Sequence, residues 1–114
     1  MKPSILMLGI TALGLSLGTL SATAAVPTAA QISAAKTSAD HEALAKAYES
    51  EAKSLEKMAA RHRDLGQTYG QPGGKPWQPA MAKHCDSVSS ELEAAAKEEH
   101  ALAEEHHKMA KGGQ

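Results

Sequence analysis

A stretch rich in glycine and proline divides the chain and limits the possible folds more than any other feature. Residues 66–79 contain seven Gly or Pro residues, and such a stretch cannot remain helical. On either side, residues 38–65 and 80–111 contain neither, and they are rich in Ala, Glu, Lys, Leu and Met, which favour helix. The sequence therefore predicts two long helices, residues 38–69 and 79–111, joined by a loop at residues 70–78.

The ends of the predicted helices carry their own signals. Ser38 or Asp40 is a suitable N-cap for the first helix, and Pro79 suits the first turn of the second. Residues 25–37 are rich in Ala, Thr and Ser and are interpreted as an N-terminal tether, with a frayed helix as the alternative.

Both long segments carry apolar residues at alternating steps of three and four, which is the pattern of helices packed lengthwise. We call these two series the heptad seam: His41, Leu44, Tyr48, Glu51, Leu55, Met58, His62, Leu65 and Tyr69, followed by Met81, Cys85, Val88, Leu92, Ala95, Glu99, Leu102, His106 and Met109. Small Ala residues beside the seam would let the two helix axes approach closely. The predicted fold is all-α, an antiparallel two-helix hairpin.

The loop position predicts which residues face one another. If Tyr69 and Gln78 border the loop, His41 faces His106 and His62 faces Cys85. The core of such a hairpin is thin, because Ala is its main apolar residue and Phe is absent. Small domains with a thin core commonly need a partner chain, so we expect a homodimer that forms a four-helix bundle.

The first residues have the order of a secretory signal peptide. A basic residue, Lys2, precedes an uncharged run at residues 5–20, and small residues follow at 21–25. We interpret residues 1–24 as a signal peptide and expect a periplasmic or secreted protein with no membrane span after cleavage. The 12 basic and 13 acidic residues are interspersed, which gives no indication of a nucleic-acid partner.

Two segments carry a family resemblance, HEALAKAYESEAKSLEKMAARHRDLG and MAKHCDSVSSELEAAAKEEHALAEEHHKMA. They resemble a group of exported bacterial helical-hairpin proteins with paired H-E-A-L-A and A-x-x-H helices, to which no activity is assigned. The resemblance covers most of the chain after residue 24 and implies the hairpin fold, but it provides no site residue.

Histidine and cysteine residues on the seam suggest a transition-metal site. At the loop end, His62 faces Cys85 and His84 lies one residue from the seam; at the open end, His41 faces His106. Imidazole and thiolate are ligands that zinc or copper accepts. The alternative is structural, because seam histidines can simply form hydrogen bonds with facing groups and fix the helix register. His100 and His107 are expected to point away from the seam.

The predicted function is a non-enzymatic binding role in the cell envelope. A smooth helical seam provides neither a concave pocket nor an oxyanion site, so catalysis is not expected. The specific hypothesis is binding of zinc or copper through His62, His84, Cys85, His41 and His106. The alternative hypothesis is a protein-interaction or chaperone-like module in which these histidines are structural.

Overall fold

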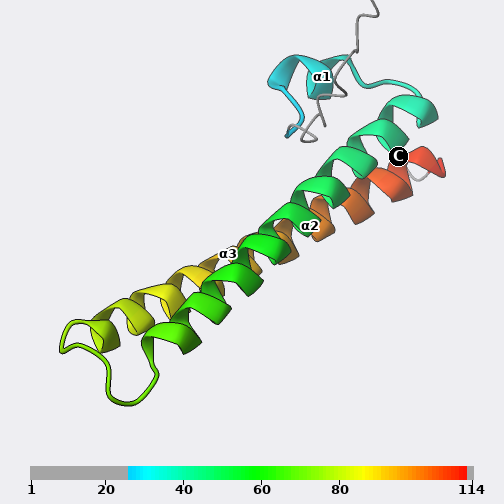
Figure 1. Ribbon diagram of the computed structural model, residues 1–114. Coiled ribbons are helices and arrows are strands. Elements are labelled where there is room, and N and C mark those ends of the chain that lie inside the picture. The colour runs from blue at the N-terminus through cyan, green and yellow to red at the C-terminus, as the bar shows by residue number, and fades with distance from the viewer. Residues whose placement is uncertain (1–25, 113–114) are drawn as a thin grey trace, which may run out of the picture.

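The protein is all-helical and is dominated by two long helices that pack against each other (Figure 1). The computed structural model describes residues 26–112, which contain α1 (Ala29–Ala34), α2 (Ser38–Tyr69) and α3 (Gln78–Ala110), with no β-strand in that range. α2 and α3 run antiparallel and form the predicted hairpin. The predicted signal peptide, residues 1–24, lies outside the described residues.

The segment before α2 is more ordered than a simple tether, and neither of the two predicted N-cap residues caps the helix. Residues 29–34 form the short helix α1. α2 is capped by Thr37 rather than by Ser38 or Asp40: the Thr37 hydroxyl accepts from the backbone N–H of Asp40 at 3.1 Å. The Asp40 carboxylate accepts in return from the backbone N–H groups of Thr37 and Lys36, both at 2.9 Å. This reciprocal capping box satisfies the first backbone donors of α2.

The connection between the long helices occupies residues 70–77. Gly73 adopts a φ of +79°, a conformation that L side chains rarely adopt. α3 begins at Gln78, with Pro79 in its first turn as predicted, and it ends at Ala110 rather than at residue 111. At the loop, Trp77 lies edge-on to Tyr69, with ring centroids 6.1 Å apart.

The centre of the α2–α3 contact is a column of small residues spaced seven apart. The column consists of Ala45, Ala52, Ala59 and Gly66 on α2 and Ser89, Ala96 and Ala103 on α3. Apart from Gly66, which is also buried, each is at most 4% exposed. The Ser89 hydroxyl donates to the backbone carbonyl of Ala59 at 2.9 Å, across the two helices. Close approach of the backbones is possible because no large side chain lies between them.

The predicted heptad seam is therefore not the centre of the contact between the two helices, where the small residues lie instead. The larger seam residues lie beside the column, on one side of the hairpin. Near the open end His41, Leu44 and Tyr48 are buried there, whereas Met58 and Leu65 are exposed. We call this side the apolar flank, and it comprises the seam residues defined above. The other side, the polar flank, consists of acidic, basic and histidine residues that are again spaced seven apart: Glu42, Glu49, Glu56 and Arg63 on α2, and Glu93, His100 and His107 on α3.

α1 lies beside the start of α2, near the open end of the hairpin (Figure 1). A pocket of about 290 Å³ lies between them and is lined by Pro27, Gln31, Leu44 and Ala47, among others. Pro27 and Leu44 are both buried. Among the residues described, no helix combines the length and the hydrophobicity required to span a bilayer.

Candidate functional site

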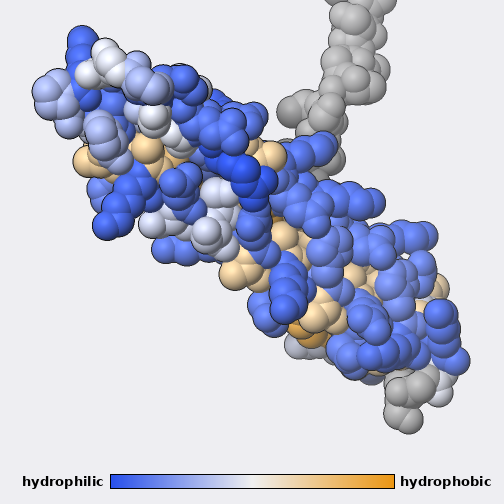
Figure 2. Space-filling view, turned by 90° about the horizontal axis from the view of Figure 1, so that it is seen from below, coloured by the Kyte–Doolittle hydropathy of each residue, from blue (hydrophilic) through white to orange (hydrophobic). Residues whose placement is uncertain are grey.

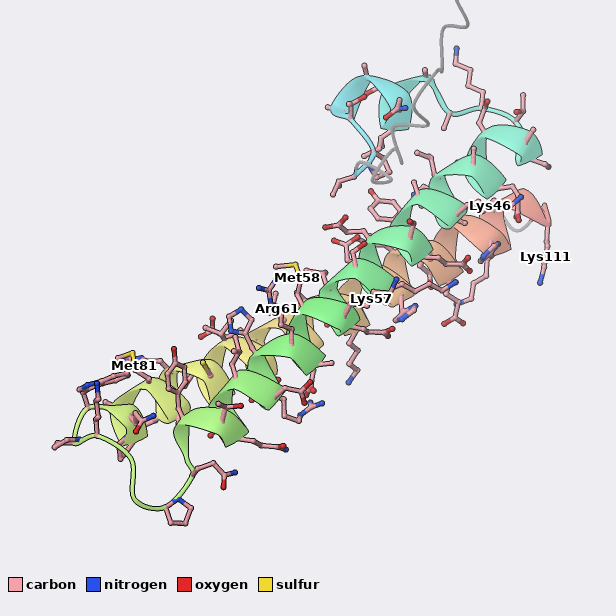
Figure 3. The ribbon with its side chains drawn as sticks, in the orientation of Figure 1. Lys46, Lys57, Met58, Arg61, Met81 and Lys111 are labelled. Carbon is pink, nitrogen blue, oxygen red and sulfur yellow. The ribbon has the colours of Figure 1, made fainter. Side chains whose placement is uncertain are left out.

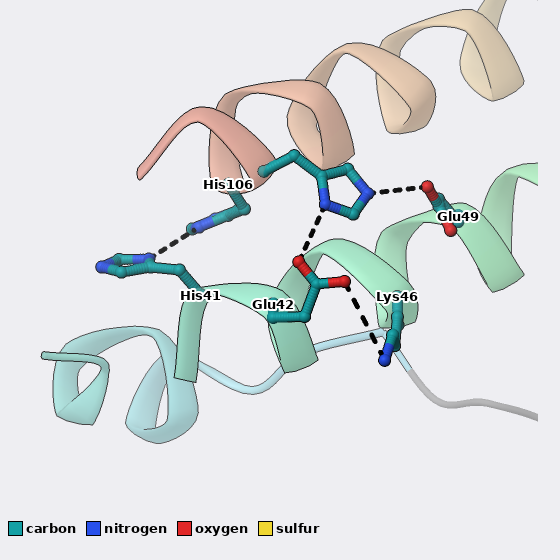
Figure 4. A network of polar contacts seen from close by, with 6 residues as sticks. His41, Glu42, Lys46, Glu49 and His106 are labelled. Carbon is teal, nitrogen blue, oxygen red and sulfur yellow. Dashed lines mark hydrogen bonds and ion pairs between the residues drawn. The ribbon is translucent and has the colours of Figure 1, made fainter. Parts of the chain in front are cut away.

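At the open end of the apolar flank, two histidines from different helices are in contact. His41 Nδ1 and His106 Nδ1 lie 3.1 Å apart, which is the pairing predicted from the loop position (Figure 4). The two rings are stacked with centroids 5.3 Å apart, and the Tyr48 ring stacks on that of His106 with centroids 5.6 Å apart. His41 and Tyr48 are buried. The three rings therefore form a packed aromatic layer between α2 and α3.

The His41–His106 contact limits the charge of this layer. A hydrogen bond between two ring nitrogens needs one donor and one acceptor, so at least one of the two facing nitrogens carries no proton. Burial lowers the pKa of His106 below its ordinary value, and the neighbouring His41 lowers it further. A neutral His106 offers a nitrogen lone pair, which is the form that binds metals and accepts hydrogen bonds.

His107, the next residue in the sequence, belongs to the polar flank. Its Nδ1 lies 3.0 Å from a Glu42 carboxylate oxygen and its Nε2 lies 2.8 Å from Glu49, both on α2 (Figure 4). These two contacts raise the pKa of His107 above its ordinary value, and the contact with Glu49 has the larger effect. Glu42 also lies 3.9 Å from Lys46. The imidazole of His107 thus connects the two helices.

The polar flank continues towards the loop with the same heptad spacing. His100 Nε2 lies 2.8 Å from Glu56, and Arg63 forms an ion pair with Glu93. The prediction that His100 and His107 point away from the seam is consistent with these contacts, but the role of this flank was missed. The signal was present in the sequence, since acidic residues at 42, 49 and 56 recur opposite histidines at 100 and 107.

The loop-end residues predicted to bind metal are not brought together as a complete site. His62 and Cys85 are half-buried and His84 is exposed. Cys85 packs against Gly66, where an added Cβ would lie 3.4 Å from the Cys85 Cβ. Among residues 26–112, no group of three or more His, Cys, Asp or Glu side chains is arranged to hold a metal ion. Within this range, candidate ligands therefore come together at most in pairs.

Two polar atoms on the apolar flank are buried without a hydrogen-bond partner in the described part of the chain. They are the Nδ1 of His62 and one carboxylate oxygen, Oε2, of Glu99. Burial raises the pKa of the Glu99 carboxyl above its ordinary value, and the nearby Glu51 carboxylate raises it further. Both side chains occupy the same heptad position, since His62 follows Leu55 by seven residues and Glu99 follows Leu92 by seven.

Large apolar side chains on this flank remain exposed to solvent. Met58 is 50% exposed, Leu102 is 43% exposed, and Leu65 and Met81 are each 38% exposed. Figure 3 shows Met58 and Met81 projecting from the same side of the hairpin. By contrast, the side of the hairpin seen in Figure 2 is mostly hydrophilic, with small apolar areas between charged side chains.

Comparison with known proteins gives no family assignment. No family model, no curated protein and no solved structure matches this chain.

Proposed function

We propose that the protein is a non-enzymatic, exported helical-hairpin module that acts through protein–protein contacts of its apolar flank, and that it forms a four-helix bundle with a second copy. The observation that supports this most strongly is the exposure of Met58, Leu65, Met81 and Leu102 on one side of the hairpin. Large apolar side chains that gather on one exposed side of a protein are typical of interaction surfaces. Export to the periplasm or beyond rests on the signal-peptide character of residues 1–24.

The small core supports a partnered state. The column that holds α2 to α3 is made of Ala, Gly and Ser, which bury little apolar area per residue. The larger side chains that would normally supply the core of a helical bundle lie on the flank instead. Pairing two flanks would remove them from water and create the four-helix arrangement in which such helices are commonly found.

Replacing Met58 by lysine tests this proposal, because the substitution places a charge at the centre of the exposed flank. Sedimentation of the purified protein should show a dimer, and Met58→Lys should weaken the dimer at least about tenfold because a charge would be buried. Circular dichroism should remain helical, since Met58 makes little contact within one chain. The control is Ala60→Lys, at an exposed position outside the flank. A protein that sediments as a monomer at micromolar concentration would refute the dimer.

The His41–His106 pair supports a second candidate function, binding of zinc or copper. Zinc binds histidine nitrogens at about 2.0–2.1 Å, so two nitrogens on one tetrahedral ion are separated by about 3.3 Å. The observed Nδ1–Nδ1 separation of 3.1 Å is close to this value. The pair would supply two ligands, and further ligands would have to come from water or from another chain.

Equilibrium dialysis against zinc and against copper, with elemental analysis, tests this second candidate. Binding should depend on His106 and should weaken as pH falls, because a protonated imidazole nitrogen cannot bind a metal ion. His106→Ala should lose the metal, whereas His100→Ala, on the polar flank, should retain it. The loop-end hypothesis is tested in the same way with His62→Ala, His84→Ala and Cys85→Ser. Equal binding by His106→Ala and His100→Ala would eliminate the open-end site.

A further inference from the structure

The two unpartnered polar groups of the apolar flank, on His62 and Glu99, lie at equal distances on opposite sides of the middle of the hairpin. Leu55 on α2 and Leu92 on α3 face each other in the register set by the His41–His106 contact. His62 lies seven residues beyond Leu55, towards the loop, and Glu99 lies seven residues beyond Leu92, towards the open end. Each is therefore about 10 Å from the Leu55–Leu92 level, in opposite directions along the hairpin.

We infer that the second copy packs on the apolar flank in antiparallel orientation, about a two-fold axis at the Leu55–Leu92 level, so that His62 of each chain meets Glu99 of the other. This inference rests on the dimer proposed above and specifies its orientation and its polar contacts. A two-fold axis across the hairpin exchanges the loop end of one copy with the open end of the other. It places His62 of each copy at the same height along the bundle as Glu99 of the other copy, so the dimer contains two such layers.

The apolar side chains have a complementary arrangement about the same axis. Met81 precedes Leu92 by eleven residues and Leu102 follows it by ten, so Met81 of one copy comes to the height of Leu102 in the other. Both side chains are exposed in the single chain. The leucines at 55 and 92 from the two copies form an apolar layer at the axis, and the two His62–Glu99 layers lie on either side of it. Buried polar layers of this kind fix the register of helical bundles.

Charge argues against the parallel alternative, in which both loops lie at the same end. That arrangement places Glu99 and Glu51 of one copy at the height of the same two carboxylates in the other. Glu99 already experiences repulsion from Glu51 and a cost of burial within one chain. Doubling the number of carboxylates in one layer would increase this cost, whereas the antiparallel dimer supplies an imidazole to each acidic pair.

Disulfide trapping distinguishes the two orientations. In the antiparallel dimer, the two Cys85 residues lie about 20 Å apart along the bundle, so diamide should not link them. A cysteine at the axis, Leu55→Cys in a Cys85→Ser background, should be linked efficiently. The control for random collisions is Lys57→Cys in the same background, because residue 57 is exposed and lies two positions from Leu55, on a different face of α2.

Each outcome has a defined meaning. Linking of Leu55→Cys but not of Cys85 or Lys57→Cys supports the antiparallel dimer. Efficient linking of Cys85 overturns the inference in favour of the parallel dimer, in which His62 and Cys85 of both copies share one layer and form a four-ligand set suitable for zinc. A dimer in sedimentation that is linked at neither position overturns this axis without affecting the proposed dimer. A monomer overturns both.

A charge-reversal experiment tests the His62–Glu99 contact itself. His62→Glu should weaken the dimer at least about tenfold, because it places a third carboxylate beside Glu99 and Glu51 of the other copy. Adding Glu99→Lys to this variant should restore dimerisation, since a lysine then faces the new carboxylate. The matched control is Gln67→Glu, which makes the same change in charge at an exposed position. Unchanged affinity in His62→Glu would refute the contact.

Discussion

His106 and His107 are adjacent in the sequence but lie on opposite flanks of the hairpin, where their environments differ. His107 is held between two carboxylates of the facing helix, which raise its pKa. His106 is packed against His41 and Tyr48, and burial lowers its pKa. On the polar flank, the cross-helix contacts are completed within one chain. On the apolar flank, Met58 is half exposed and the buried His62 Nδ1 has no partner among the described residues. This difference is the reason why we propose the apolar flank, and not the polar flank, as the contact surface.

A large side chain in the central column should have the largest effect, because the column holds both flanks in place. Ala59 is 1% exposed and its carbonyl accepts from Ser89, so Ala59→Leu forces the two backbones apart. We expect a loss of about 2–3 kcal/mol in the free energy of unfolding, from overpacking at a contact with no space to receive the side chain. Urea unfolding followed by circular dichroism measures it.

The control for this substitution is its neighbour. Ala60 is exposed, so Ala60→Leu should change the free energy of unfolding by less than about 0.5 kcal/mol. Equal destabilisation by the two variants would mean that the column is not the centre of the helix contact.

The two adjacent histidines should respond to pH in opposite ways, which tests the comparison between the flanks directly. The folded pKa of His107 is raised, so its contribution to stability is present below the unfolded value of about 6.5 and is lost as pH rises through the folded value. The folded pKa of His106 is lowered, so stability is lost as pH falls from the unfolded value towards the folded one. Residue-resolved NMR should show His107 titrating at higher pH than His106.

Unfolding of two variants provides the corresponding thermodynamic measurement. The destabilisation caused by His107→Ala should grow as pH falls from 8.5 to 6, because the charged imidazole is what the carboxylates stabilise. The destabilisation caused by His106→Ala should shrink as pH falls from 7.5 to 5, because the native protein itself loses stability there. Parallel pH dependence of the two variants would mean that the flanks do not differ electrostatically.

The sequence predicted the overall hairpin because its main signals are local. The Gly- and Pro-rich stretch must interrupt the helices, and Pro79 is compatible with a first helical turn. The loop position also placed His41 opposite His106 correctly. Thr37 was missed as the N-cap because Thr, Ser and Asp all occur within four residues, and the choice among them depends on where the first helical N–H groups point.

The packing of the two helices was harder to predict because the most hydrophobic residues of this chain are not the most buried ones. Apolar periodicity suggested that Leu55, Met58 and Leu65 lie at the helix contact, yet Met58 and Leu65 are exposed and Ala52 and Ala59 are buried. Alanine contributes little to a hydrophobic pattern, but its size permits the closest approach of two backbones. The polar flank was missed for a related reason, since Glu–His pairs across helices become evident only when the heptad position of each is known.

Gly66 should give the smallest effect, because two opposing contributions nearly cancel at the loop end of the column. Replacing a glycine by alanine within a helix favours folding by about 1 kcal/mol. The added Cβ would lie 2.7 Å from the Asp86 Oδ1, which is the end of an exposed and flexible side chain and can move aside. It would also contact the Cys85 Cβ at 3.4 Å, a tight but tolerable distance. We therefore expect Gly66→Ala to change the free energy of unfolding by less than about 1 kcal/mol, with stabilisation the expected sign. Gly66→Leu, measured in the same urea series, should destabilise because its side chain cannot fit beside Cys85. If Gly66→Ala destabilised the protein as much as Gly66→Leu, the prediction would be wrong, because the Asp86 side chain would then be unable to move aside for the added Cβ.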